Sequence, residues 1–226
     1  MFLLFVKYPE PGSVKTRLGI NIGYKNAAKL YSAFILDILN TLKTGEFLFK
    51  IYFYPEEKKQ LLSGWLGNEY SYKPQQGTNL GERMLKGFED SFAEGHKKTI
   101  IIGSDSPDLP LSFLKEADNT LTNHDAVIGP SKDGGYYLIG FRNDTFVSFV
   151  FDNIPWSSSS VFKHTISILN NLNYNIHILP EWNDIDTFDD IKSLIQRSSN
   201  SAFSNSETMA VISSWKKCKQ VWIQTL

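Results

Sequence analysis

A run of three isoleucines, Ile100 to Ile102, most constrains the fold that this chain can adopt. The run lacks the polar alternation of a strand with one face in water, so it predicts a strand, Thr99 to Ile102, covered by helices on both faces. Such strands are typical of a mostly parallel sheet in an α/β protein. Asp105 follows within three residues of the strand. Because ligands of open α/β sheets bind beyond the carboxyl ends of strands, Asp105 is placed where a metal or substrate would be.

The polar residues after this strand also have an interpretation that needs no ligand. Ser106 and Asp108 precede a helix that we expect from about Leu111, and either side chain could cap its first turn. For Asp108, capping explains the residue as well as substrate binding does. For Asp105, capping is the less favoured explanation and a ligand role is preferred.

A basic loop, Lys7 to Gly19, follows another apolar run, Phe2 to Val6, which predicts a second central strand. Pro9, Pro11 and Gly12 lie in the loop, and we expect them to exclude regular structure there. Lysine supplies a point charge and arginine a two-pronged donor, so the loop is predicted to hold phosphate. The residues predicted to do so are Lys7, Gly12, Lys15 and Arg17, with Ser104 of the central turn. The alternative is a solvated loop with incidental charge, and the spacing is not that of a P-loop.

Arg83 lies in the first turn of the helix expected after a glycine-containing polar loop at positions 75–79. A cation in that place opposes the helix macrodipole, which makes Arg83 a candidate for contact with an anion. A salt bridge to Glu82 or Asp90 would account for it equally well.

Asp133 opens an Asp-Gly-Gly turn ahead of an aromatic strand. Paired glycines let the backbone approach a ligand closely, so Asp133 is a candidate catalytic base or an acceptor for a sugar hydroxyl. An ordinary Asp-Gly turn is the competing interpretation. The serines at positions 157–160 are expected to cap the next helix. The predicted substrate-binding residues are Asp108, Gly134, Gly135, Tyr137 and Trp156.

A second acidic turn follows the last predicted strand. Thr187 and Asp190 have the spacing of a capping box, which explains Asp190 without any ligand. Capping does not explain Asp184 and Asp186, which precede the helix. Magnesium is typically bound through one or two carboxylates plus substrate phosphates. Asp105 and Asp186 could supply those carboxylates to Mg²⁺ or Mn²⁺, with a nucleotide diphosphate or triphosphate as the ligand.

Five blocks of the chain resemble a known family: KYPEPGSVKTRL at 7–18, GERM at 81–84, GSDSPDL at 103–109, GPSKDGGYYLIG at 129–140 and DIDT at 184–187. They resemble the bacterial nucleotide-diphospho-sugar transferase-like family, which includes arsenosugar-biosynthesis glycosyltransferases. The resemblance implies a GT-A fold, which is a three-layer α/β sandwich with a mostly parallel central sheet. It also implies a nucleotide-sugar donor and a divalent metal. In related nucleotidyltransferases the two acids matching Asp105 and Asp186 bind that metal.

The chain departs from the pattern of the resembled family in two places. Asn79 stands where an acid is usual, and Phe188-Asp189 stands where Pro-Glu is usual. The first departure argues against an acidic role at position 79, and the second leaves the helix cap intact.

These features favour a metal-dependent glycosyltransferase with a nucleotide-diphospho-sugar donor and a small-molecule acceptor. The alternative is a nucleotidyltransferase that joins a nucleoside triphosphate to a phosphorylated small molecule and releases pyrophosphate. The loop at 7–19 has only Gly12 and Gly19, fewer glycines than usually wrap a triphosphate, and so favours the first. A third alternative is a nucleotide-binding module without turnover.

Composition excludes several classes of protein. The net charge of −1 argues against a nucleic-acid surface built on bulk positive charge. A single cysteine, Cys218, excludes an internal disulfide and a multi-cysteine zinc site. No apolar run approaches the roughly 18 residues needed to span a bilayer, and the apolar start is too short for a signal sequence. We therefore expect a cytoplasmic protein without nucleic-acid or membrane partners.

The chain of 226 residues suits one large domain, predicted at 1–197, followed by a Ser/Asn-rich linker and an amphipathic helix at 198–226. One stripe of this helix carries Met209, Ile212, Trp215 and Trp222, opposite Lys216, Lys217 and Lys219. We expect the stripe to pack on the fold or on a partner, such as a second copy of the chain. Binding to a membrane surface is the less favoured alternative.

Overall fold

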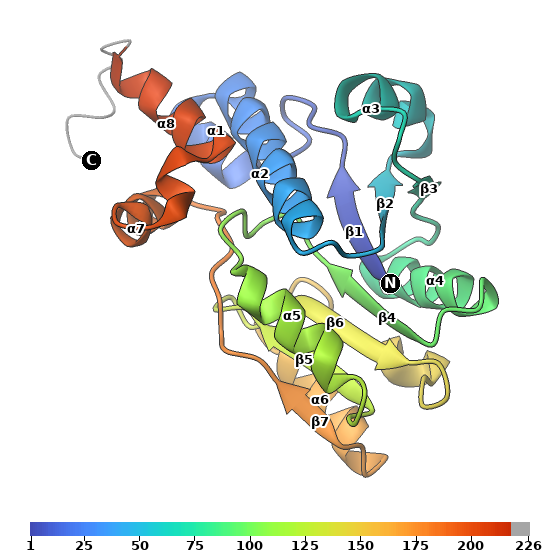
Figure 1. The fold of residues 1–226 in the computed structure, drawn as a ribbon. Helices are drawn as coiled ribbons and strands as arrows, with labels where there is room; N and C mark the ends of the chain where they lie inside the picture. Colours follow the sequence, from blue (N-terminus) through green and yellow to red (C-terminus); the bar gives the residue numbers. More distant parts are fainter. Residues whose placement is uncertain (218–226) are drawn as a thin grey trace.

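One seven-stranded sheet, ordered β3-β2-β1-β4-β6-β5-β7, runs through the centre of the protein (Figure 1). The computed structural model describes residues 1–217. Of the described strands, β6 alone runs antiparallel to its neighbours, so the sheet is mostly parallel, as predicted. The strands are β1 (Phe2–Lys7), β2 (Phe49–Tyr54), β3 (Tyr72–Pro74), β4 (Lys98–Ile102), β5 (Ala126–Pro130), β6 (Tyr136–Arg142) and β7 (Ile176–Ile178).

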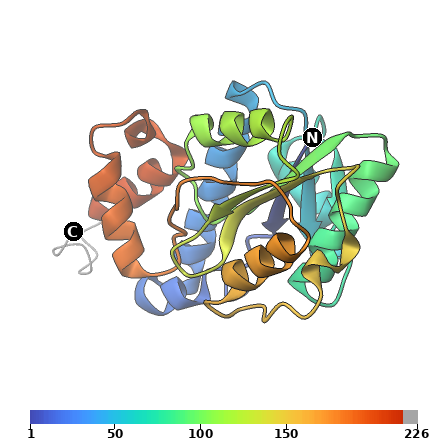
Figure 2. The same ribbon diagram turned by 90° about the horizontal axis from the view of Figure 1, so that it is seen from below.

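Helices cover both faces of the sheet and complete a three-layer sandwich. The described helices are α1 (Thr16–Ile22), α2 (Tyr24–Thr44), α3 (Lys59–Leu66), α4 (Leu80–Ala93), α5 (Leu111–Thr120), α6 (Val161–Asn171), α7 (Phe188–Ser198) and α8 (Glu207–Lys217), with short 3₁₀ turns η1 (Glu56–Lys58), η2 (Ser148–Phe151) and η3 (Ala202–Asn205). Figure 2 shows α5 on one side of the sheet and α6 on the other.

The central strands are apolar on both faces because each face contributes to a separate core. In β1, Phe2, Leu4 and Val6 pack into the core under α2 and α5. Leu3 and Phe5 alternate with them and pack into the core under α4 and α6. The isoleucines of β4 divide in the same way and are all buried. The prediction of a doubly covered central strand is therefore confirmed.

The register of the sheet gathers the polar segments at one edge. Leu4 of β1 pairs with Ile102 of β4, so the loops that follow these two parallel strands leave the sheet together. The antiparallel strand β6 pairs Leu138 with Ile102, which brings its first residues to the same edge.

Three predictions about local structure are wrong. The basic loop is not irregular as far as Gly19, because α1 begins at Thr16. Ser106 and Asp108 do not cap α5, whose N-cap is Pro110 without a side-chain hydrogen bond. Ser160 precedes α6 but its side chain forms no cap either. The capping box of Thr187 and Asp190 at the start of α7 is confirmed.

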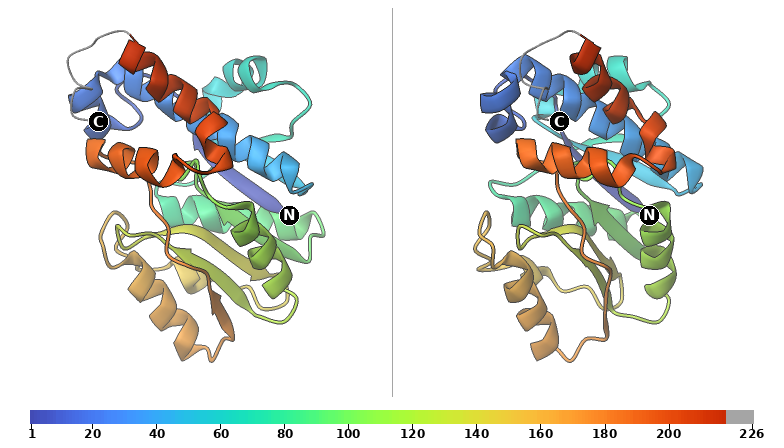
Figure 3. Two further views of the ribbon diagram at one scale, coloured as in Figure 1. Left: turned by 60° about the vertical axis from the view of Figure 1, so that its left-hand side comes forward. Right: turned by 90° about the vertical axis from the view of Figure 1, so that its left-hand side faces the viewer.

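The C-terminal helix α8 packs back on the fold, lying along α2 (Figure 3). Ile212 and Trp215 are buried in the core that α2 covers. Asp37 of α2 holds the start of α8, because its carboxylate accepts the backbone N–H groups of Glu207 and Thr208, each at 2.9 Å. The predicted stripe residue Trp222, together with Cys218 and Lys219, lies outside the described residues.

Within residues 1–217, no helix combines the length and the apolar character needed to cross a membrane.

Candidate functional site

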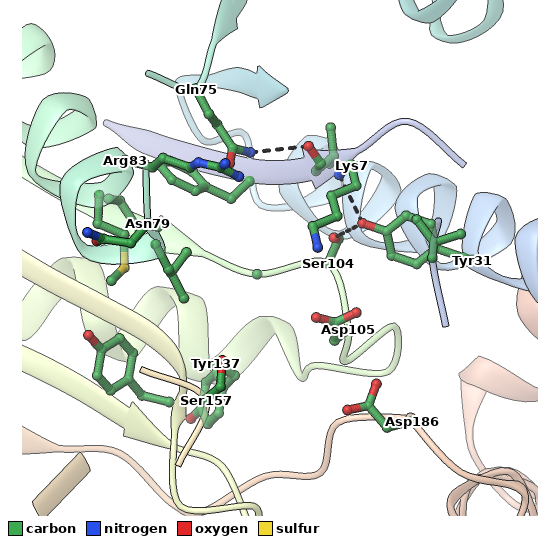
Figure 4. A pocket seen from close by; sticks show the side chains of 18 of the residues that line it. Lys7, Tyr31, Gln75, Asn79, Arg83, Ser104, Asp105, Tyr137, Ser157 and Asp186 are labelled. Atoms are coloured by element: carbon green, nitrogen blue, oxygen red, sulfur yellow. Dashed lines mark hydrogen bonds between the residues drawn. The ribbon is translucent and has the colours of Figure 1, made fainter. Parts of the chain in front are cut away.

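A cleft of about 600 Å³ opens at the edge of the sheet where β1 and β4 end and β6 begins. Figure 4 shows many of the side chains that line it, with Asp105 and Asp186 near each other in the same part of the cleft. Seven predicted site residues line the cleft: Lys7, Lys15, Arg83, Ser104, Asp105, Tyr137 and Asp186. The fold thus brings together residues from segments that are far apart in the sequence.

The two acidic turns are joined by a backbone hydrogen bond. The N–H of Ile185 donates to the carbonyl oxygen of Asp105 at 2.9 Å. Ile185 is itself fully buried, which places Asp184 and Asp186 on either side of an anchored residue. A second link runs from the Ser106 hydroxyl to Asp184 Oδ1, at 2.6 Å. These links fix the carboxylates of the second turn next to Asp105.

Lys15 lies between the two predicted metal ligands. Its Nζ is 2.5 Å from Asp105 Oδ1 and 2.7 Å from Asp186 Oδ1. The Lys15 side chain is 3% exposed, whereas those of Asp105 and Asp186 are 49% and 42% exposed. Burial lowers the Lys15 pKa, but the two carboxylates outweigh burial and the net pKa is raised. Lys15 was predicted to hold phosphate, and in this structure its charge is instead taken up by two carboxylates.

Asp184 belongs to the site, although the sequence interpretation assigned it no role. Burial, and then the nearby charge of Asp105, raise the pKa of Asp184 to about 7. Its signal in the sequence was that it stood ahead of the helix, where capping could not explain it.

Tyr31 is a second residue that sequence reasoning missed, because its place on the apolar stripe of α2 indicates only core. Its hydroxyl oxygen lies 2.6 Å from Ser104 Oγ and accepts the backbone N–H of Lys7 at 3.1 Å. Burial raises the pKa of Tyr31 to about 12, so the hydroxyl stays protonated. Tyr31 therefore ties the end of β1 to the turn after β4.

The far rim of the cleft is formed by the segment from Gln75 to Arg83. Gln75 Nε2 donates to the carbonyls of Val6 and Tyr52, at 3.1 and 2.8 Å. Arg83 Nε donates to the carbonyl of Gly77 at 3.1 Å, and its guanidinium carbon lies 4.0 Å from the centre of the Tyr54 ring.

The alternative of a salt bridge from Arg83 is wrong. Glu82 instead accepts hydrogen bonds from Thr78 and Asn79, and Asp90 pairs with lysines 73 and 86. Asn79 caps α4, with its side chain accepting from the backbone N–H of Glu82.

Asp108 lies outside the lining of the cleft and pairs within the chain, and its predicted substrate-binding role stays a prediction. Its side chain is 6% exposed and forms a two-pronged ion pair with Arg197, with N–O distances of 2.6 and 2.9 Å. This pair holds α7 against the turn that follows β4.

The Asp133 turn lies outside the lining of the cleft. Asp133 Oδ1 accepts from the Ser131 hydroxyl and from the backbone N–H of Gly135, which is the geometry of an ordinary Asp-Gly turn. Gly134 has φ +91°, and a Cβ there would meet the backbone oxygen of Ser159 at 2.1 Å. Close packing between two loops thus requires the glycine, and no ligand is needed to explain it.

Three further predicted residues also stay outside the lining. Gly12 lies at an exposed turn, and Arg17 is exposed on the first turn of α1. Trp156 packs against α4, where a Cβ on Gly81 would come within 2.6 Å of its ring.

The donor set at Asp105 and Asp186 fits a divalent cation. Both carboxylates already contact one cationic group, the Lys15 ammonium, and carboxylate oxygens are the ligands that Mg²⁺ prefers. Within the described part of the chain, no group of three or more His, Cys, Asp or Glu side chains could hold a metal ion. A metal here would therefore need further oxygen ligands from a substrate or from water.

Comparison with known proteins places the chain in a family. Residues 38–158 match the model of a family described as uncharacterized protein conserved in bacteria (DUF2064). The chain belongs to this family. Among curated proteins, none matches it.

A crystal structure of a proposed nucleotide-diphospho-sugar transferase from Desulfovibrio desulfuricans is 40% identical to this DUF2064 protein. The match covers 96% of this chain and 94% of that one, with a TM-score of 0.92. The expected resemblance and the expected fold class are both confirmed.

Two more distant structures share the fold alone. Molybdopterin-guanine dinucleotide biosynthesis protein A from Archaeoglobus fulgidus is 15% identical, with a TM-score of 0.54 over 89% of this chain and 100% of that one. The 4-diphosphocytidyl-2C-methyl-D-erythritol synthase from Anaerococcus prevotii is 10% identical, with a TM-score of 0.56 over 87% and 99%.

Proposed function

We propose that this protein is a metal-dependent glycosyltransferase that takes a sugar from a nucleotide-diphospho-sugar donor to a small-molecule acceptor. The observation that carries the proposal is that Asp105 and Asp186, at the wall of the cleft, both contact one cationic group, the Lys15 ammonium. The similarity to the Desulfovibrio desulfuricans protein, proposed to be a nucleotide-diphospho-sugar transferase, supports the same class of donor.

The reaction breaks the bond between the sugar C1 and the diphosphate oxygen, and forms a bond from C1 to an acceptor oxygen. Negative charge builds on the departing diphosphate, so catalysis requires cationic groups fixed beside it. Asp105 and Asp186 would hold Mg²⁺ or Mn²⁺, which supplies positive charge next to that leaving group. Lys7 and Arg83 line the same cleft and would contribute charge from the protein itself.

Other residues of the chain hold the backbone of Lys7 and the guanidinium of Arg83. Tyr31 anchors the backbone of Lys7 and the hydroxyl of Ser104, and the Arg83 guanidinium rests on the Tyr54 ring. Groups that are already oriented need little reorganisation when charge develops. Asp133 stays the predicted acceptor base, although its turn lies outside the lining of the cleft, so the proposal requires an acceptor that extends beyond that lining to reach Asp133. Two hydrogen bonds fix Asp133 Oδ1, while Oδ2 has no hydrogen bond within residues 1–217.

The test combines ligand binding with product release. A thermal-shift panel of nucleoside diphosphates, triphosphates and nucleotide sugars, with and without Mn²⁺, should show metal-dependent stabilisation. Asp105→Asn should abolish most of that shift, whereas Asp189→Asn, a change at an exposed acid outside the cleft, should leave it intact. An unchanged shift in Asp105→Asn would refute the assignment of the metal site.

Product analysis separates glycosyl from nucleotidyl transfer. Nucleotide sugars with Mn²⁺ should slowly release nucleoside diphosphate, because water can replace the acceptor. Release of pyrophosphate from a triphosphate and a sugar phosphate, lost in Asp105→Asn, would instead identify a nucleotidyltransferase.

A further inference from the structure

Lys15 is a buried cation at the centre of the site, and three observations show how closely the fold holds it. Its ammonium contacts one oxygen of Asp105 and one of Asp186. The rings of Tyr31 and Phe34 flank the same ammonium, with centres 5.9 and 5.7 Å away. The side chain is almost fully shielded from water although both carboxylates remain accessible.

The backbone at Lys15 breaks the local rules for a helix start. Lys15 is the N-cap of α1 and has φ 46° and ψ 45°, in the left-handed region that residues with a Cβ rarely adopt. N-cap positions favour Ser, Thr, Asp or Asn, whose side chains bond the first turn, and Lys15 makes no such bond. A residue that is locally unfavourable and still firmly held points to a function for its side chain.

The carboxylates explain why a positive charge is needed at the position of the Lys15 ammonium. Two carboxylates held close together, with Asp184 beside them, repel one another unless a positive group lies between them. Lys15 supplies that charge from within the chain. A divalent cation held by Asp105 and Asp186 would need these same carboxylates, so the ammonium and the metal would compete for them.

We propose that the Lys15 ammonium occupies the place of the divalent cation and exchanges with it. When metal and nucleotide bind together, the ammonium moves from Asp105 and Asp186 to the donor diphosphate. This inference rests on the metal site of the proposed function. A dication would repel the ammonium from the carboxylates. The displaced ammonium would then bind the diphosphate, because Lys15 lines the cleft that would hold the diphosphate. Metal and nucleotide then bind cooperatively, and each raises the affinity of the other by the same factor.

The experiment measures Mn²⁺ affinity in the nucleotide-free protein by isothermal titration calorimetry. Lys15→Met removes the competing ammonium while keeping an unbranched side chain, and should bind Mn²⁺ at least tenfold more tightly than the unaltered protein. Lys7→Met is the matched control, because it removes one positive charge from the same cleft at a residue that has no ion pair within residues 1–217. Its Mn²⁺ affinity should change less than threefold. Adding Asp105→Asn to Lys15→Met should cancel the gain.

A merely structural lysine would give a different result. If Lys15 only holds the two turns together, Lys15→Met should lose thermal stability and gain no Mn²⁺ affinity. If the methionine variant does not fold, the Mn²⁺ titration is repeated with Lys15→Gln, whose amide can still donate to both carboxylates. Equal or weaker Mn²⁺ binding by a folded Lys15 variant would overturn the exchange and leave the metal site intact. Absence of Mn²⁺ binding in the unaltered protein and in every variant, even with nucleoside diphosphate present, would overturn both the exchange at Lys15 and the proposed metal site.

Discussion

Replacing Tyr31 by Phe should destabilise the protein by about 2 kcal/mol, although it removes only one oxygen atom. The Tyr31 hydroxyl serves two partners, Ser104 Oγ at 2.6 Å and the backbone N–H of Lys7 at 3.1 Å. Ser104 is 3% exposed, so water replaces the lost partner poorly although the residue lines the cleft, and a buried unsatisfied group costs about 1–3 kcal/mol. Lys7 is exposed at the end of β1, so its backbone N–H should recover part of its loss by binding water. The ring itself stays, so packing against Phe34 is kept.

Urea unfolding followed by tryptophan fluorescence measures this loss as a lower midpoint with an unchanged m-value. A double-mutant cycle with Ser104→Ala isolates the shared bond, and the two changes together should cost about 1 kcal/mol less than their sum. A loss below about 0.5 kcal/mol in Tyr31→Phe, the range of ordinary surface substitutions, would refute the view that this hydroxyl joins β1 to the central turn.

Three further predictions concern other buried polar groups. Asp37→Ala should cost about 1–2 kcal/mol in urea unfolding, because the start of α8 loses its carboxylate cap, and Asp37→Asn should cost less. Arg197→Ala should cost about 3–5 kcal/mol by the same measurement, since it leaves the Asp108 carboxylate buried and unpaired. Burial raises the pKa of Asp184 to about 7, above the value near 4 expected in the unfolded chain. The folded protein therefore binds that proton more tightly, so thermal stability in EDTA should fall as pH rises from about 4 to 7, and Asp184→Asn should remove this decline.

The central strand β4 and the cap of α7 could be predicted from the sequence because their causes are local. Ile100 to Ile102 indicate a doubly covered strand by composition alone, and the structure buries all of them. The capping box at Thr187 and Asp190 is complete within four residues of sequence. Neither feature depends on which distant segment packs nearby.

The partners of the charged side chains could not be predicted, because each partner lies far away in the sequence. Lys15 stands in a segment rich in cations, which favours an anionic ligand, and its contact with Asp186 joins residues 171 positions apart. Asp108 has the right spacing for a cap, but Arg197, 89 residues later, takes its carboxylate. A charged residue in a loop indicates that some opposite charge will be found, and only the fold decides whether a ligand or the chain supplies it.

The direction of β6 explains how Tyr137, which lies at the start of that strand, reaches the cleft. The blocks at 7–18 and 103–109 follow β1 and β4, so parallel strands deliver them to one edge of the sheet. Tyr137 lies near the start of its strand, and in a parallel strand it would lie at the opposite edge. Because β6 runs antiparallel to β4 and pairs Leu138 with Ile102, its first residues return to the edge where Asp105 lies. The reversal of one strand therefore brings Tyr137 into the same cleft as the two acidic turns.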